Sequence, residues 1–292
     1  MNTQKIWLDT DIGSDIDDAL ALAFLLNRPD CDLLGISTVT EIDKQRAQLA
    51  SILCRIAERD VPIYAGTRTS LIVEPPQKTV PQAVALPKYA HATDFAAPAF
   101  AAIEAMRAAI YQNPGEVTLL GIGPMTNIAL LFAIDPAVPS LLKQLVLMCG
   151  HFTPPNKNCE WNALNDPHAT AIVYAAPVQK HISIGLDVTR QVTMERPESE
   201  EKLRQSKYGA PILDMGGAWF QDHDIVTFHD PLAAATIFEP EICQYQTGFV
   251  SIESADAALY GFTDWKAGQG ETHTVALEVD AQKFFDLYFA TI

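Results

Sequence analysis

The sequence predicts an α/β fold: a single domain over residues 1–292 with a mostly parallel, doubly wound central sheet, helices on both faces and a small antiparallel C-terminal region. Short β-branched apolar runs alternate with helical patterns through the first 190 residues, as expected of parallel strands joined by crossover helices. Polar residues follow several strand ends, where such sheets bind ligands. Hydrophobic residues make up 48% of the chain, enough for a sizeable core.

The first strand–helix unit, residues 6–26, has an acidic turn. The apolar run 6–8 is typical of a buried strand, and residues 19–26 have high helix propensity. The acids between them are Asp9, Asp11, Asp15, Asp17 and Asp18. Two carboxylates about 4 Å apart near a surface repel by roughly 4 kcal/mol. A helix N-terminus stabilises a nearby carboxylate by only about 1 kcal/mol. Either some acids stay protonated or a cation lies among them, and an all-oxygen site favours Ca²⁺ or Mg²⁺. Alternatively, two acids cap the helix and the rest are solvated.

The next units continue the alternation and then interrupt it. Residues 33–40 and 61–65 are predicted strands, separated by a helix over 43–59 with apolar residues at helical spacing. Residues 67–94 form a long irregular segment with prolines at 75, 76, 81 and 87, and such segments are often functional. A helix at 98–112, a strand at 117–123 and a helix at 128–134 follow.

The second half begins regularly and ends differently. A strand at 145–148 leads into a polar loop, a helix starts at Asp166-Pro167, and a strand covers 182–186. Residues 195–228 are predicted to be helical, polar and interrupted by prolines and glycines. His229-Asp230-Pro231 then opens an apolar helix. The pattern of residues 245–279 predicts antiparallel strands, and residues 281–292 a final helix.

Charge and composition limit the partners. The net charge of −16 argues against nucleic acid or an anionic membrane. No apolar stretch is long enough to span a bilayer, and the polar start at 1–5 with a short apolar run after it predicts no signal sequence. Five scattered cysteines without a CxxC pair predict reduced thiols and a cytoplasmic protein.

Four motifs occur in the order found in nucleoside hydrolases: DTDIGSDIDDALAL at 9–22, GIGPMTNIALL at 121–131, EWN followed by DP at 160–167, and HDPLA at 229–233. The chain resembles the inosine–uridine-preferring nucleoside hydrolase superfamily over nearly its full length. The first and last motifs together are specific, whereas either alone is weak. The usual opening motif is DxDPGxDDAxAL. Here Ile12 replaces its proline and two extra residues precede Asp17, which leaves the role of Asp15 open.

The resemblance implies calcium-dependent hydrolysis of the N-glycosidic bond of ribonucleosides, releasing base and ribose. It implies a Ca²⁺ held by Asp11, Asp18, the main-chain carbonyl of Thr126, and Asp230. A metal-bound water would attack C1′, with Asp11 as its base. His229 would be the general acid for the departing base; alternatively, it only orients Asp230.

The resemblance also implies the sugar contacts. Asp17, Glu160 and Asn162 would hydrogen-bond ribose hydroxyls, and Met148 and Trp161 would pack around the sugar. Alternatively, Trp161 belongs to the core. His91 would flank the base or is a surface-loop histidine. Asp9 would lie behind the ligands and orient the turn. The base contacts would fall in segments 67–94 and 195–228, so the preferred nucleobase is not determined.

The chain departs from the family pattern at two further positions. Ile42 stands where an Asn or Asp is common after the second strand, with Glu41 or Asp43 as possible substitutes. Pro154 stands where an Asn is common, six residues before the Glu of EWN. Both changes affect the surroundings of the ribose and the water. They therefore bear on the identity of the substrate more than on the binding of the metal.

Two other interpretations compete with nucleoside hydrolysis. A haloacid-dehalogenase-type Mg²⁺ phosphatase also has a DxDx motif after its first strand, but that scheme has no role for the two further acids, GPMTN or HDP. A non-catalytic Ca²⁺- or ribose-binding relative would have lost turnover through the changes at 42 and 154. The expected partner is a small-molecule ribonucleoside, and family members are often homodimers or homotetramers.

Overall fold

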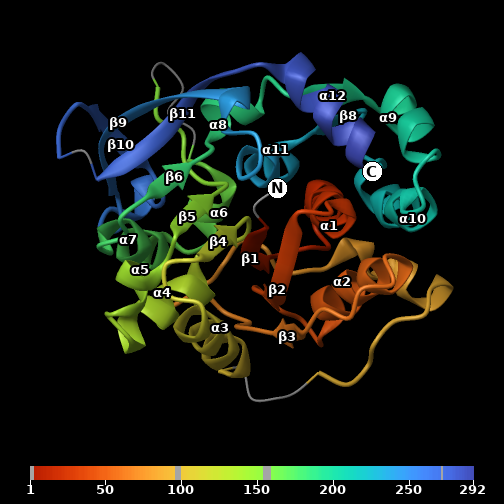
Figure 1. The fold of residues 1–292 in the computed structure, drawn as a ribbon, viewed down its shortest axis with the longest axis horizontal. Coiled ribbons are helices and arrows are strands. Elements are labelled where there is room, and N and C mark those ends of the chain that lie inside the picture. The colour runs from red at the N-terminus through yellow and green to blue at the C-terminus, as the bar shows by residue number, and fades with distance from the viewer. Residues whose placement is uncertain (1–2, 96–99, 154–158, 271) are drawn as a thin grey trace.

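A sheet of nine strands runs through the molecule, as the computed structural model in Figure 1 shows for residues 3–95, 100–153, 159–270 and 272–292. Its strand order is β10-β9-β11-β6-β5-β4-β1-β2-β3. The strands from β11 to β3 pair in parallel, and β9 is antiparallel to both β10 and β11. The bounds are β1 Gln4–Thr10, β2 Cys31–Thr38, β3 Ile63–Ala65, β4 Val117–Gly121, β5 Gln144–Leu147, β6 His181–Ser183, β9 Cys243–Ile252, β10 Thr263–Ala267 and β11 His273–Val279.

Helices cover both faces of the sheet, which confirms the predicted architecture. One face carries α1 (Asp17–Asn27), α2 (Gln45–Ile56), α11 (His229–Thr236) and α12 (Ala281–Thr291). The other carries α3 (Ala101–Gln112), α4 (Thr126–Ile134), α5 (Val138–Leu141) and α7 (Pro167–Ala175). Successive strand residues point to opposite faces. Ile6 and Leu8 of β1 therefore join the first core, while Trp7 joins the second.

The remaining elements complete the described chain. They are α6 (Trp161–Asn165), α8 (Leu186–Thr189), α9 (Arg196–Leu203), α10 (Gly209–Trp219), the 3-10 helices η1 (Pro81–Lys88), η2 (Pro240–Ile242) and η3 (Ala257–Leu259), and the strands β7 (Thr193–Glu195) and β8 (Ile225–Thr227). In the described part of the chain, no helix combines the length and the apolar character needed to cross a membrane.

The chain order creates a switch point in the middle of the sheet. From β1 the chain moves outward to β2 and β3, then returns to form β4 on the opposite side of β1. The connections that leave β1 and β4 therefore diverge, and a crevice opens outside their carboxyl ends. The acidic turn follows β1, so the topology places its carboxylates at this crevice.

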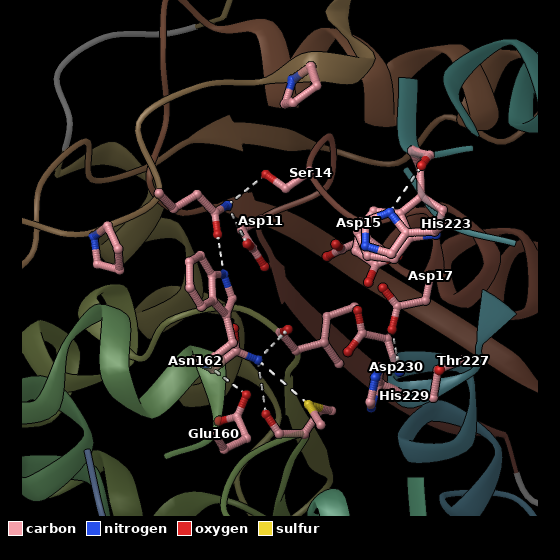
Figure 2. Close-up of a pocket in the computed structure, with 18 of the residues that line it drawn as sticks. Asp11, Ser14, Asp15, Asp17, Glu160, Asn162, His223, Thr227, His229 and Asp230 are labelled. Carbon is pink, nitrogen blue, oxygen red and sulfur yellow. Dashed lines mark hydrogen bonds between the residues drawn. The ribbon is translucent and has the colours of Figure 1, made fainter. Parts of the chain in front are cut away.

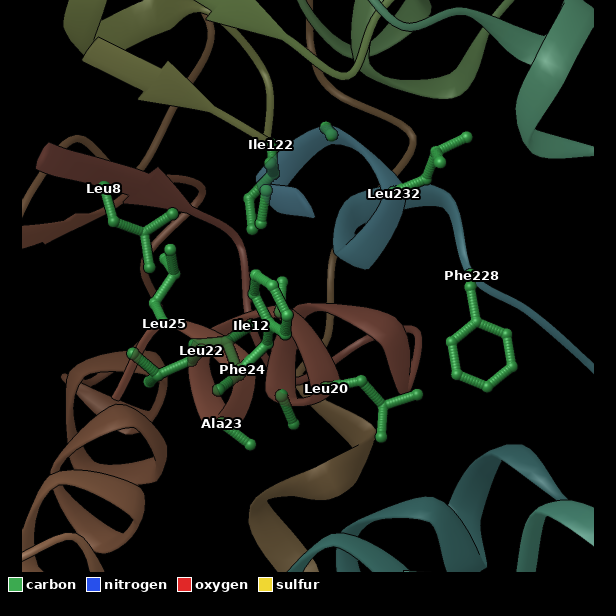
Figure 3. Close-up of a cluster of buried hydrophobic side chains, with 14 of the residues drawn as sticks. Leu8, Ile12, Leu20, Leu22, Ala23, Phe24, Leu25, Ile122, Phe228 and Leu232 are labelled. Carbon is green, nitrogen blue, oxygen red and sulfur yellow. The ribbon is translucent and has the colours of Figure 1, made fainter. Parts of the chain in front are cut away.

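A shared core holds α1 and α11 together (Figure 3). Every residue of α1 from position 17 to 26 is buried, as expected of a helix that is apolar all round. Leu20 of α1, Leu232 of α11 and Phe228 just before it belong to one cluster with Ile12 of the acidic turn. This packing brings the two helix N-termini to the same crevice.

The structure differs from the sequence prediction in detail. The antiparallel strands expected over residues 245–279 are confirmed, and they extend the main sheet through β11. Segment 195–228 contains α9 and α10 but ends in β8, which pairs with β7 as a two-stranded antiparallel sheet. Strands of three residues are too short to show period-two alternation. The strand expected at 182–186 ends at residue 183, because residues 186–189 form α8.

Candidate functional site

A pocket of about 670 Å³ lies at the switch point. Its wall comes from the acidic turn, residues 76–81, the residue after β4, the residue after β5, α6, the end of α10 and the start of α11. Figure 2 shows side chains from these elements converging on one space. The pocket therefore joins the acidic motif, EWN and HDP, which are up to about 220 residues apart.

Three carboxylates form the most compact acidic group in the described residues. One oxygen from each of Asp17, Asp18 and Asp230 lies within 4.8 Å of the other two. Asp17 and Asp18 occupy the first turn of α1, and Asp230 the first turn of α11. The Asp230 N–H donates to Asp17 Oδ2 at 3.1 Å, and the Thr10 hydroxyl donates to Asp18 Oδ1 at 2.5 Å. Two helix N-termini thus face the group, which favours negative charge there.

Burial is the main cause of the raised pKa values of the acids at this site. It raises the pKa of Asp11, Asp17, Asp18 and Asp230, and repulsion from neighbouring carboxylates raises the last three further. The pKa of Asp15 is raised to about 7 for the same reasons. Buried carboxylates that repel one another are stabilised by a cation, and an oxygen-only donor set fits a hard divalent ion. The residues present therefore fit the metal that the resemblance implies.

A buried cation supports the acidic turn from behind. Arg46 of α2 is fully buried, and each of its five N–H groups has an acceptor. The acceptors are the carbonyls of Asp11, Ile12, Thr40 and Thr79 and the hydroxyl of Ser14. Desolvation lowers the pKa of Arg46, while the nearby charges of Asp11 and Asp18 oppose that shift. Sequence reasoning missed Arg46, because an arginine in a helix is usually exposed.

Asp11 lies between two supports. Gln77 Nε2 donates to Asp11 Oδ2 at 2.6 Å. On the other side, a Cβ atom at Gly123 would lie 2.7 Å from Asp11 Oδ1, so only glycine lets the loop after β4 approach this closely. The structure thereby explains the second glycine of GIGPMTN.

Asp9 lies deeper than Asp11. Ser37 and Asn127 donate hydrogen bonds to Asp9 Oδ1 at 2.5 and 2.8 Å, and burial raises the pKa of Asp9 to about 7.

The residues expected around the sugar line the pocket together. Glu160 caps α6 and accepts hydrogen bonds from the N–H groups of Asn162 and Ala163. Burial raises the pKa of Glu160 to about 7, although these hydrogen bonds by themselves lower it. The Asn162 amide donates to the carbonyls of Ile122 and Met148 at 2.9 and 3.1 Å.

Trp161 lies at the pocket surface. Its side chain is 49% exposed, so it does not belong to the core. Its indole N–H donates to Gln77 Oε1 at 2.7 Å. The aromatic face of Trp161 is therefore available to a ligand, as the resemblance implies.

His229 lines the pocket next to Asp230 (Figure 2). Its Nδ1 lies 2.7 Å from Thr189 Oγ1. Burial, with a smaller contribution from Arg190, lowers the pKa of His229 to about 4. The ring is therefore neutral at pH 7 in this state. No hydrogen bond joins the ring to Asp230 among the described contacts, which gives no support to a purely orienting role.

The structure does not bring two expected residues to the pocket. His91 is not among the lining residues, and its Nδ1 lies 2.9 Å from the Tyr89 carbonyl oxygen. Thr126 is also absent from the lining: its hydroxyl donates to Asp166 Oδ2 at 2.7 Å, and as the first residue of α4 its carbonyl points along the helix. Ile122, four residues earlier, lines the pocket instead.

The positions that depart from the family pattern differ in whether they line the pocket. Glu41 does not replace the missing residue at position 42, because its carboxylate accepts the N–H groups of Arg46 and Ala47 at the start of α2. Neither position 42 nor position 43 lines the pocket. Pro154 lies outside the described residues. Asp15, from the two-residue insertion, does line the pocket.

Segment 195–228 contributes a stacked aromatic pair to the pocket wall. The rings of Trp219 and His223 stack with centroids 3.6 Å apart and planes 3° apart. Both residues line the pocket. Their spacing of four residues at the end of a helical pattern was the available signal.

The fold and this site define an α/β protein with an acidic, cation-compatible pocket at the switch point of a parallel sheet. Residues 6–286 match the family described as inosine-uridine preferring nucleoside hydrolase. The chain belongs to this family and is a nucleoside hydrolase, a glycosidase acting on N-glycosyl bonds.

Individual relatives agree with the assignment. The chain is 32% identical to the non-specific ribonucleoside hydrolase RihC of Salmonella enteritidis over 308 aligned positions, covering 96% of this chain and 94% of that protein. It is 28% identical to the probable uridine nucleosidase 2 of Arabidopsis thaliana, covering 86% and 83% of the two chains. These comparisons support neither the phosphatase nor the non-catalytic interpretation.

Solved structures show the same fold. A plant nucleoside hydrolase, the PpNRh1 enzyme, superimposes with a TM-score of 0.86 at 24% identity, covering 99% of this chain and 98% of that one. A purine-preferring ribonucleoside hydrolase from Gardnerella vaginalis gives a TM-score of 0.85 at 22% identity, with the same coverage.

Proposed function

We propose that the protein is a calcium-dependent ribonucleoside hydrolase, which adds water at C1′ and breaks the C1′–N bond to release ribose and free base. The observation that carries this proposal is the buried group of Asp17, Asp18 and Asp230 beside a pocket of about 670 Å³. The relatives named for ribonucleoside and uridine hydrolysis support the substrate class.

The oxygen donors around the acidic group suit Ca²⁺. We assign Asp18 and Asp230 of this group as ligands, together with the neighbouring Asp11. Asp17, the third member of the group, is directed to a ribose hydroxyl. The main-chain ligand first expected at Thr126 is reassigned to Ile122, because only Ile122 lines the pocket. When bound, the ion supplies positive charge that orients ribose hydroxyls and lowers the pKa of a water molecule.

Asp11 is the proposed general base. It accepts the proton of the attacking water as the C1′–N bond breaks, and positive charge develops on the ribosyl group. The surrounding carboxylates stabilise that charge. Glu160 and Asn162 contact ribose hydroxyls, and Met148 and Trp161 pack against the sugar.

His229 is the proposed donor to the departing base. Burial lowers the pKa of His229 to about 4, so the ring is neutral at pH 7 before the base departs. Negative charge that develops on the base during bond breaking raises the pKa of an adjacent imidazole. Proton donation is thereby coupled to departure of the base. His91 has no place in this proposal.

A screen of purine and pyrimidine ribonucleosides for released ribose tests the proposal. Activity with at least one nucleoside, lost with a calcium chelator and restored by added Ca²⁺, is expected. Hydrolysis that survives complete removal of divalent metal would contradict the calcium role. Calcium binding with no ribose released from any nucleoside would contradict the catalytic role.

A further inference from the structure

Gln77 connects the proposed base to the aromatic wall of the pocket. The residue is buried, with only 8% of its surface exposed. Nε2 donates to Asp11 Oδ2 at 2.6 Å and to Ser14 Oγ at 2.8 Å. Oε1 accepts the indole N–H of Trp161 at 2.7 Å. Every polar hydrogen and the oxygen of this amide therefore has a partner.

The chemistry of the partners fixes which way the amide points. An indole N–H can only donate, so the oxygen of Gln77 faces Trp161. An ionised Asp11 can only accept, so the nitrogen faces the carboxylate. A glutamate here would place a second carboxylate 2.6 Å from Asp11 Oδ2. An asparagine is one methylene shorter and could not span both contacts. The position therefore calls for glutamine.

The backbone of Gln77 is held separately from its side chain. Its N–H donates to Asn165 Oδ1 at 3.2 Å, and Asn165 Nδ2 donates to the Trp161 carbonyl at 2.8 Å. Further along, Gln82 N–H donates to the Gly13 carbonyl at 3.1 Å, which ties the segment to the acidic turn. Replacing the Gln77 side chain therefore leaves the path of segment 77–82 supported.

We propose that Gln77 is a positioning residue that sets the Asp11 carboxylate and the Trp161 ring in one hydrogen-bonded unit. The contact to Asp11 occupies one lone pair of one oxygen and restricts rotation of the carboxylate. The contact to Trp161 restrains the indole ring of a residue that lines the pocket. The orientation of the reactive carboxylate and the shape of the ligand pocket thereby depend on the same amide. The inference rests on the proposed function for the role of Asp11.

The variant Gln77→Leu tests this role against a matched control. Leucine keeps much of the volume but removes all three side-chain hydrogen bonds. Gln82→Leu is the control, because Gln82 also anchors the segment, donating to the Asp15 carbonyl at 2.5 Å, but makes no bond to a carboxylate. Partners behind a metal ligand typically contribute 10- to 100-fold in metal affinity or activity. Calorimetry should show the Ca²⁺ affinity of Gln77→Leu falling about 10- to 100-fold, and that of Gln82→Leu changing less than about threefold. Equal effects in both variants would mean that Gln77 only anchors the segment, which would overturn the inference.

The link to Trp161 is tested by a double-mutant cycle. Trp161→Phe keeps an aromatic ring and removes the N–H donor. If Gln77 and Trp161 act as a unit, the losses of kcat in the double variant should be clearly smaller than the product of the two single losses. Multiplicative losses would overturn the coupling.

A second readout does not need turnover. Acrylamide quenching of Trp161, taken as the difference between each protein and its Trp161→Phe version, should increase in Gln77→Leu and stay constant in Gln82→Leu. Unchanged quenching in Gln77→Leu would also overturn the inference. If the wild-type protein released no ribose from any nucleoside, the proposed function would fail, while the quenching result would still decide whether Gln77 holds Trp161.

Discussion

The backbone N–H of Asp230 donates a hydrogen bond to Asp17 Oδ2 at 3.1 Å, across 213 residues of sequence. The first turn of α11 is thereby fixed to the first turn of α1. Because this bond and the shared apolar core hold the two helices, contacts within the protein keep the carboxylates of Asp17, Asp18 and Asp230 together. A preformed group of this kind favours a tight cation site.

Removing one charge from the group should weaken calcium binding. Asp230→Asn keeps the shape of the side chain and its backbone N–H, but lowers the ligand charge, which is a main determinant of Ca²⁺ affinity. We expect the affinity measured by calorimetry to fall at least about tenfold. Asp264→Asn, on the exposed strand β10, is the control and should bind as the wild type does. An unchanged affinity in Asp230→Asn would place the ion elsewhere.

The metal-free protein should lose stability as the pH rises. Folding raises the pKa values of Asp9 and Asp15 from 3.8, and of Glu160 from 4.5, to about 7. Between about pH 4 and 7 the folded state therefore holds protons that the unfolded chain has released, and the free energy of unfolding falls with increasing pH. Thermal unfolding with a chelator should show Tm decreasing over this range. Added Ca²⁺ should restore Tm most strongly at the upper end. If Tm of the metal-free protein instead rose between about pH 4 and 7, the predicted loss of stability with increasing pH would be wrong.

Asp11→Asn should abolish most hydrolysis while the fold survives. The amide keeps the shape but cannot take the proton of the attacking water, and a general base contributes about 10²- to 10⁴-fold. We expect kcat to fall by at least about 100-fold, with some loss of calcium affinity. Activity within about tenfold of the wild type at saturating Ca²⁺ would exclude Asp11 as the base.

His229→Ala should discriminate between leaving groups. Nucleobases leave poorly as anions, whereas p-nitrophenol leaves well without a proton. We expect kcat/KM for inosine or uridine to fall by about 100-fold or more, the usual scale for a general acid, and kcat/KM for p-nitrophenyl riboside to change little. Parallel losses on both substrates would instead mean that His229 positions Asp230 and the ion.

Arg46→Met should destabilise the fold strongly. The change removes a buried charge and leaves buried acceptors in the acidic turn and in segment 67–94 without their donor, each costing about 1–3 kcal/mol. We expect the free energy of unfolding in denaturant to fall by at least about 3 kcal/mol. Arg55→Met lies on the same helix but is exposed, so it should change stability by less than about 0.5 kcal/mol. Similar effects of the two variants would show that Arg46 has no special structural role.

The sequence determined the architecture and the chemical type of the site. Alternating strands and helices predict a parallel sheet, because each pattern reflects local burial on one or two faces. Asp11 follows β1 and Glu160 lies after β5, and parallel strands present their carboxyl ends at one edge. Asp230 follows β8 of the separate two-stranded sheet, so its place at this edge depends on the packing of α11 against α1. The architecture needs only periodicity and chain order, whereas Glu160 and Asp230 were singled out by the resemblance to nucleoside hydrolases. All three residues line one pocket.

Tertiary structure decided the contacts behind and beside these residues. Arg46 and Gln77 belong to unremarkable sequence contexts, and only the crossing of α2 and segment 67–94 over the acidic turn brings them within hydrogen-bond distance. Thr126 and His91 fall outside the pocket because one turn of helix, or a few residues of loop, moves a side chain by several ångströms, a displacement that motif spacing does not specify. Sequence periodicity fixes the direction in which a side chain points within its own element. The distance between side chains on different elements depends on packing across the whole core.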